Sequence, residues 1–255
     1  MLSAFRQPLA AITALLLAGA TLPGQTASEL IEKGDPFYAK LQASEALKFY
    51  LPAERLDPKN GRLIVRISRE YRHEMSDAAT TVEKLRLGRL AADYARRAVA
   101  LNPNDPEAEL AVAISYGKLQ PFEGSRERIE ALRVIKAAAD KVIALDPSND
   151  LGWHVLGRWH LALAELSAVK RAIAEVAYGK LPASTYEEGA ICFEKAIELK
   201  PDRLMHYIEL GRTYADMGRT AEARKVILKG LAMPPTEKDD PETKDRGRQI
   251  LASLR

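Results

Sequence analysis

Apolar residues recur along this chain at i, i+3, i+4 and i+7, the spacing of one face of an α-helix. The third position of each stripe is a small residue, which lets a second helix approach closely. The stripes therefore predict amphipathic helices that pack in pairs. Their members are Ile64, Ile67, Ser68 and Tyr71; Glu109, Val112, Ala113 and Tyr116; Trp153, Leu156, Gly157 and His160; and Tyr207, Leu210, Gly211 and Tyr214.

A second pattern precedes five prolines, which are spaced 45, 44, 54 and 34 residues apart. A helix–turn–helix unit of about 34 residues, with insertions, explains all four spacings. Small, large and small residues at i, i+4 and i+7 mark the second helix of such a unit. The prolines are Pro58, Pro103, Pro147, Pro201 and Pro235; the clearest second-helix patterns are Ala46, Tyr50 and Ala53; Gly189, Phe193 and Ala196; and Ala223, Ile227 and Gly230.

Together the two patterns resemble the tetratricopeptide repeat over residues 27–235. The resemblance implies an all-α fold, an α-solenoid of about five helix pairs, because one pair cannot bury its apolar face alone. The repeats would end near residues 58, 103, 147, 201 and 235. Acidic residues and Pro241 then open a last helix, and we expect residues 236–255 to cap the solenoid.

The fourth unit is about 20 residues longer than the others, and the insertion covers residues 164–184. Leu166, Val169, Ile173 and Val176 form an apolar stripe within it. This stripe predicts a helix that buries one side against the solenoid. We expect Trp159 to pack beneath that helix.

A narrower resemblance rests on the segment 153–159, on the insertion, and on the motifs at 113–117, 179–182, 186–189 and 193–196. Over about residues 100–235 the chain resembles the regulator of microtubule dynamics family. Animal members of that family are linked to microtubules and mitochondria. For a chain with a secretory leader, the resemblance implies a bacterial relative outside the cytoplasm, which shares the fold and its insertion and not the microtubule role.

Residues 1–27 have the features of such a leader: a single charge at Arg6, an apolar run from residue 9 to 17, and small residues at Ala18 and Ala20. Cleavage after Ala20 fits the pattern best, and cleavage after Ala27 is the alternative. The sequence therefore predicts a periplasmic or secreted protein. An uncleaved N-terminal membrane anchor is the other interpretation.

Composition and short motifs exclude several classes of function. A formal net charge of +3 is too small to indicate a nucleic-acid partner. Cys192 is the only cysteine, so no internal disulfide can form. The four histidines lack metal-ligand spacing, and no nucleophile or phosphate-loop motif is present. We therefore expect a non-enzymatic protein without cofactor or metal.

The first helix of each pair offers a candidate binding face opposite its packed stripe. Arginines repeat on this face, and at 100° per residue those after Pro58 point directly away from the core. They predict a cationic concave groove for a protein or peptide partner with acidic groups, or for an anionic head group, because arginine binds carboxylates through two parallel hydrogen bonds. The alternative is a solvated face balanced by Glu70, Glu74 and Glu209. The predicted groove residues are Arg62, Arg66, Arg69, His73, His154, Arg158 and Arg212.

The same face also carries an apolar strip, which favours a different class of function. With the inserted helix closed over it, the strip would form a pocket for a lipid or another apolar ligand. In a third interpretation the inserted helix fills the groove and the binding surface lies elsewhere. The strip comprises Leu110, Ile114, Leu151, Val155, Met205 and Ile208.

Overall fold

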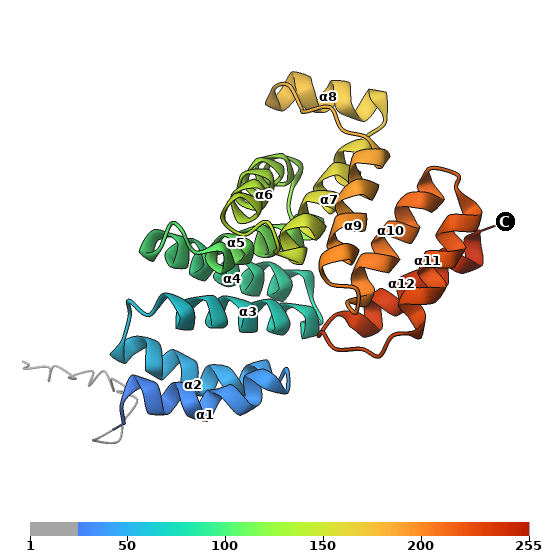
Figure 1. The fold of residues 1–255 in the computed structure, drawn as a ribbon. Helices are drawn as coiled ribbons and strands as arrows, with labels where there is room; N and C mark the ends of the chain where they lie inside the picture. The colour runs from blue at the N-terminus through green and yellow to red at the C-terminus, as the bar shows by residue number, and fades with distance from the viewer. Residues whose placement is uncertain (1–24, 255) are drawn as a thin grey trace, which may run out of the picture.

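The computed structural model describes residues 25–254, which form twelve α-helices and one 3-10 turn and contain no strand (Figure 1). The prediction of an all-α solenoid with an inserted helix and a capping helix is confirmed. The helices are α1 (Ala27–Ala39), α2 (Ala43–Leu56), α3 (Gly61–Asp77), α4 (Thr81–Leu101), α5 (Pro106–Leu119), α6 (Ser125–Leu145), α7 (Asp150–Ala164), α8 (Ala168–Tyr178), α9 (Tyr186–Leu199), α10 (Leu204–Asp216), α11 (Thr220–Ala232) and α12 (Asp240–Ser253).

Five helix pairs stack in chain order, namely α1–α2, α3–α4, α5–α6, α7–α9 and α10–α11. The helices α2, α4, α6 and α9 each end two residues before one of the spaced prolines. A proline lacks the backbone N–H that would continue the helix, and it disfavours helical geometry in the residue before it. The prolines therefore set the turn between one pair and the next.

Small residues bring the two helices of a pair into close contact. A Cβ atom on Gly157 of α7 would lie 2.8 Å from Cε1 of Phe193 on α9. A Cβ atom on Gly211 of α10 would lie 2.2 Å from Cγ1 of Ile227 on α11. In the fourth and fifth pairs the small position of the stripe thus receives a large residue of the partner helix.

The aromatic residue that opens a stripe ties its helix to the preceding proline turn. Trp153 donates from Nε1 to the carbonyl oxygen of Pro147 at 3.0 Å, and Tyr207 donates from its hydroxyl to that of Pro201 at 2.8 Å. Trp153 is only half-buried because its indole lies beside that turn, whereas the sequence predicted a core residue.

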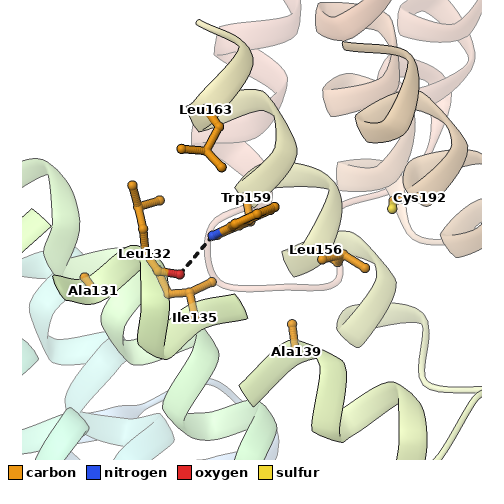
Figure 2. Close-up of a cluster of buried hydrophobic side chains, with 8 residues drawn as sticks. All are labelled: Ala131, Leu132, Ile135, Ala139, Leu156, Trp159, Leu163 and Cys192. Atoms are coloured by element: carbon orange, nitrogen blue, oxygen red, sulfur yellow. Dashed lines mark hydrogen bonds between the residues drawn. The ribbon is translucent and has the colours of Figure 1, made fainter. Parts of the chain in front are cut away.

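Trp159 is a core residue, but the prediction that it packs beneath the inserted helix is wrong. Its indole lies against α6, beside Leu132 and Ile135, and its Nε1 donates to the carbonyl oxygen of Leu132 at 2.8 Å (Figure 2). Cys192 belongs to the same cluster, and burial raises the pKa of its thiol to about 11. The cluster therefore joins the third helix pair to the fourth.

Leu166, the first member of the predicted stripe, precedes the inserted helix α8 and is half-buried against the cluster around Trp159. The rest of the stripe, on α8 itself, is not buried, so that prediction is also wrong. Val169, Ile173 and Val176 are 69%, 65% and 89% exposed. In Figure 1 α8 stands apart, beyond the ends of α7 and α9. The residues of α8 that face the solenoid are polar ones, which hold it through hydrogen bonds to neighbouring backbone groups.

The capping helix α12 packs on α10 and α11, and its preceding loop reaches much further. Asp239 lies 2.6 Å through Oδ2 from Nζ of Lys118 at the end of α5, and accepts a 2.9 Å hydrogen bond through Oδ1 from Ser76 at the end of α3. Lys238 pairs with Asp77 at 2.8 Å. We call residues 237–240 the closing loop, because they join the last part of the solenoid to α3 of its second pair and α5 of its third.

The predicted leader lies almost wholly outside the described residues, which start at residue 25. Thr26 caps α1, and its side chain and that of Glu29 exchange hydrogen bonds with each other's backbone N–H groups. Cleavage after Ala20 would leave this cap intact, and cleavage after Ala27 would remove it. None of the helices in the described range is both long and apolar enough to span a membrane.

Candidate functional site

The first helices of the pairs, α1, α3, α5, α7 and α10, form what we call the first-helix face. At its α1–α3 end the guanidinium of Arg69 lies 4.4 Å from the ring centroid of Tyr38, a cation–π geometry. Arg62 is exposed about two turns earlier on the same side of α3. Neither arginine has an acidic partner among residues 25–254. These two side chains can therefore accept a carboxylate from another molecule.

Arg66, between them on α3, is already paired. Its Nη1 lies 2.5 Å from Oδ1 of Asp35 on α1, and the same carboxylate oxygen accepts a 2.7 Å hydrogen bond from the hydroxyl of Tyr50. Burial and the adjacent carboxylate raise the pKa of Tyr50. Arg66 thus joins the first pair to the second, and it is less available to a partner than Arg62 or Arg69.

The two other predicted arginines also differ in whether they already have an acidic partner. Arg158 on α7 is exposed and has no acidic partner in the described part of the chain. Arg212 on α10 forms an ion pair with Glu165 at the end of α7 and lies 3.7 Å from Glu209 and 3.9 Å from Asp216. Of the five arginines, Arg62, Arg69 and Arg158 therefore keep open guanidinium groups.

The predicted apolar strip is only partly accessible. Leu110 and Ile208 are buried in the core, and Ile208 packs against α12, where Gly247 allows close approach. The inserted helix does not cover the four remaining members, which are half-buried. To act as a lipid carrier, the protein would need another element to cover these residues and form a pocket. The four residues are Ile114, Leu151, Val155 and Met205.

A buried polar layer between neighbouring first helices was not predicted from the sequence. Arg72 on α3 is buried and donates from Nη1 to the hydroxyls of Ser68, at 3.0 Å, and of Ser115 on α5, at 3.3 Å. Burial lowers the pKa of Arg72 to about 10. Because first helices pack against one another as well as against their partners, residues beside the apolar stripe are also enclosed.

Glu70 and His73 lie in this layer, where the sequence placed a solvated acid and a groove residue. Glu70 is fully buried, and neither of its carboxylate oxygens has a hydrogen-bond partner among the described residues. Burial raises the pKa of Glu70 to about 7. Nδ1 of His73 is 3.6 Å from Oε1 of Glu70, and burial together with nearby cations lowers the pKa of His73 to about 3.

A second buried group links α7 to α10. His206 donates from Nε2 to Oδ2 of Asp150 at 2.8 Å, so its Nδ1 accepts from Nδ1 of His154 at 2.9 Å. Burial lowers the pKa of both imidazoles. The sequence placed His154 on the open groove side; the structure encloses it and gives it a partner within the protein. Nε2 of His154 has no partner in the described range.

Glu209, expected to balance the groove from solvent, is also buried. Its Oε1 accepts from Arg246 of the capping helix at 3.0 Å. Arg203 joins the Asp150–His206 pair to the closing loop. Its Nε lies 2.9 Å from Oδ2 of Asp150, and its Nη1 lies 2.9 Å from Oε1 of Glu237. These acids and arginines come from α7, α10, α12 and the segments before α10 and α12, so no local spacing in the sequence pairs them.

A family model described as regulator of microtubule dynamics protein 1-3 matches residues 30–255. The chain belongs to this family. The mouse regulator of microtubule dynamics protein 1 is 28% identical over 229 residues, which are 89% of this chain and 74% of the relative. Protein 2 from Macaca fascicularis is 28% identical over 191 residues, 74% of this chain but 47% of the relative.

Solved structures independently support the fold. A thermophilic tetratricopeptide repeat protein of Thermus thermophilus superposes with a TM-score of 0.66 at 18% identity and covers 89% of this chain and all of its own. The MamA protein gives 0.51 at 19% identity, covering 87% and 96%. The predicted resemblances to the tetratricopeptide repeat and to the family are confirmed. Repeat solenoids of this type present extended concave surfaces on which partners bind, which agrees with the expected role as an interaction scaffold.

Proposed function

We propose that this protein is an adaptor that holds an acidic segment of a partner protein against the α1–α3 end of the first-helix face. Arg62 and Arg69 bind carboxylates there, and the ring of Tyr38 supports the Arg69 guanidinium from below. Arg158 extends the same recognition along the solenoid. The observation that carries this proposal is the pair of guanidinium groups on α3 that have no acidic partner within the described residues.

The neighbouring contacts explain why these arginines suit the role. Arg66 holds α3 to α1 through Asp35, so the helix that presents Arg62 and Arg69 is fixed in place. The Arg69 guanidinium is also held over the ring of Tyr38, and a guanidinium that is already held loses less side-chain freedom when it binds. Carboxylate recognition at such a site is ionic and exposed, so it weakens as salt increases.

We also propose that the adaptor acts outside the cytoplasm, which rests on the leader features of residues 1–27. For that reason we do not extend the activity named for the animal relatives to this chain. Detection of the mature N-terminus after export would support this location. Recovery of the unprocessed protein in the cytoplasmic fraction would contradict it.

The binding proposal is tested with a labelled peptide that carries several glutamates and with its glutamine counterpart. Arg62→Glu with Arg69→Glu should weaken binding of the acidic peptide by about tenfold, because two exposed ion pairs contribute up to about 1 kcal/mol each. The control is Arg86→Glu with Arg248→Glu, an equal charge change at two exposed arginines on α4 and α12. Equal binding by both double variants would remove the α3 arginines from the function.

A further inference from the structure

The inserted helix α8 has its polar side turned toward the solenoid and its apolar side turned outward. Arg171 donates to the carbonyl oxygens of Leu163 and Pro182, each at 3.0 Å. Glu175 accepts from the backbone N–H of Leu181 at 3.3 Å. These polar contacts fix the rotation of the helix about its axis. The outward side is therefore a defined surface.

The outward side is continuous and apolar. Val169, Ile173 and Val176 are at i, i+4 and i+7, and Ala172 and Ala177 lie exposed between and beside them. A packed valine or isoleucine stabilises a fold by about 1.5 to 3 kcal/mol, and none of these side chains makes that contribution here. An exposed apolar stripe of this kind on a soluble domain marks a surface that binds.

A groove of about 340 Å³ adjoins the stripe, between α8 and the first half of α6. Ile129, Ala177 and Tyr178 form part of it, together with Arg126, Glu130 and Arg133. Arg126 pairs with Glu130 at 3.0 Å, whereas Arg133 donates only to the carbonyl oxygen of Tyr178. The groove can take one large side chain, with an open guanidinium at its edge.

The charge around the stripe is positive. Lys170 and Lys180 are exposed at the two ends of α8, and neither forms an ion pair within the described residues. With Arg133, they place three cations without acidic partners around the apolar side chains. The surface therefore complements a partner that combines an apolar stripe with acidic flanks.

We propose that α8 and the adjoining α6 groove bind an amphipathic helix of a partner protein, with acidic residues on both sides of its apolar stripe. Such a helix lays residues spaced by three and four positions into an apolar surface, as in other helix-binding proteins. The α8 stripe has the matching spacing. This surface lies on a different element from Arg62 and Arg69, so the inference does not depend on the proposed carboxylate site.

Two other occupants fit the surface less well. A second copy of the chain would place Lys170 and Lys180 against identical cations, and the stripe is far smaller than the roughly 800 Å² per partner of a stable interface. A lipid surface is bound by helices with tryptophan, phenylalanine or leucine on the apolar side, whereas this side carries short, branched valine and isoleucine.

The test uses the full chain and a short synthetic helical peptide with leucines at i, i+3, i+4 and i+7 and glutamates on both flanks. The same peptide with lysines replacing the glutamates serves as the probe of charge. In fluorescence anisotropy the acidic peptide should bind at least about tenfold more tightly than the basic one. Val176→Asp should weaken binding of the acidic peptide by about tenfold or more, because it removes an apolar contact and adds repulsion.

Val82→Asp is the matched control, since Val82 is 78% exposed on α4 and Val176 is 89% exposed on α8. Both variants should unfold at the wild-type urea concentration, because neither side chain is packed. Absence of binding by the acidic peptide, equal binding of both peptides, or unchanged binding by Val176→Asp would overturn the inference. So would Val176-dependent dimers in ultracentrifugation, or Val176-dependent sedimentation with phosphatidylcholine–phosphatidylserine vesicles.

Discussion

Replacing Glu70 by glutamine should stabilise the protein at alkaline pH and leave its stability nearly unchanged in acid. Burial raises the pKa of Glu70 from 4.5 to about 7, so the folded state holds a proton that the unfolded chain releases above pH 4.5. Each unit of such a shift corresponds to about 1.4 kcal/mol. The buried carboxyl therefore favours folding at low pH and opposes it by about 3 kcal/mol above pH 7.

The sign follows from proton binding. Between the unfolded and folded pKa values the folded state binds more protons, so the free energy of unfolding falls as the pH rises. Glutamine has the same shape and no charge, so Glu70→Gln should remove this fall. The quantity to measure is the difference in unfolding free energy between variant and wild type, because other titrating groups cancel in it.

The assay is urea denaturation followed by circular dichroism at several pH values from about 5 to about 8. The difference should grow across this range by up to about 3 kcal/mol in favour of the variant. Glu74→Gln is the matched control, since Glu74 lies one turn further along α3, is half-buried and accepts a hydrogen bond from Ser44. A constant difference for Glu70→Gln, or a variant less stable than wild type at pH 8, would refute the reasoning.

Three further predictions concern packing, the closing loop and the thiol. Gly211→Ala should lower the unfolding free energy by about 1–3 kcal/mol, since the new methyl group would meet Ile227 at 2.2 Å; an unchanged urea midpoint would contradict the close packing. Asp239→Asn should weaken the contact with Lys118 and speed amide exchange in residues 236–243, and the difference from wild type should shrink at high salt; equal exchange would show that the loop is held otherwise. Cys192 should react slowly with a thiol reagent at pH 8 in the folded protein and rapidly in urea, because burial raises its pKa to about 11; rapid reaction in the folded state would show that the thiol is accessible.

The helix pairs could be predicted because each pair repeats the same local rule. A small residue such as Gly157 or Gly211 receives a large one such as Phe193 or Ile227, and a proline ends the unit. These contacts join residues on the two helices of one pair, so they can be predicted from the spacing of small and large residues along the sequence. The capping helix followed from the same logic, since the last pair needs a cover.

The surroundings of the first helices could not be predicted in this way. Helical angles place Glu70 and Arg72 away from the stripe of α3, yet the neighbouring helix α5 and the segments around them bury both. The rotation of α8 was also missed, because an apolar stripe was assumed to face the core. In α8, Arg171 donates hydrogen bonds to the backbone carbonyl oxygens of Leu163 and Pro182, and this orientation places the apolar stripe on the solvent side.

The closing loop determines whether repeats can be added to or removed from this solenoid. In an open array each repeat touches only its neighbours, so copies can be added or removed without altering the rest. Here Ser76 and Asp239, which are 163 positions apart in the chain, meet in one hydrogen bond. An extra helix pair between them would separate Ser76 from Asp239 and break this contact. The number of repeats is therefore fixed by geometry, and a duplication that an open array tolerates would leave the closing loop of this protein without its partners.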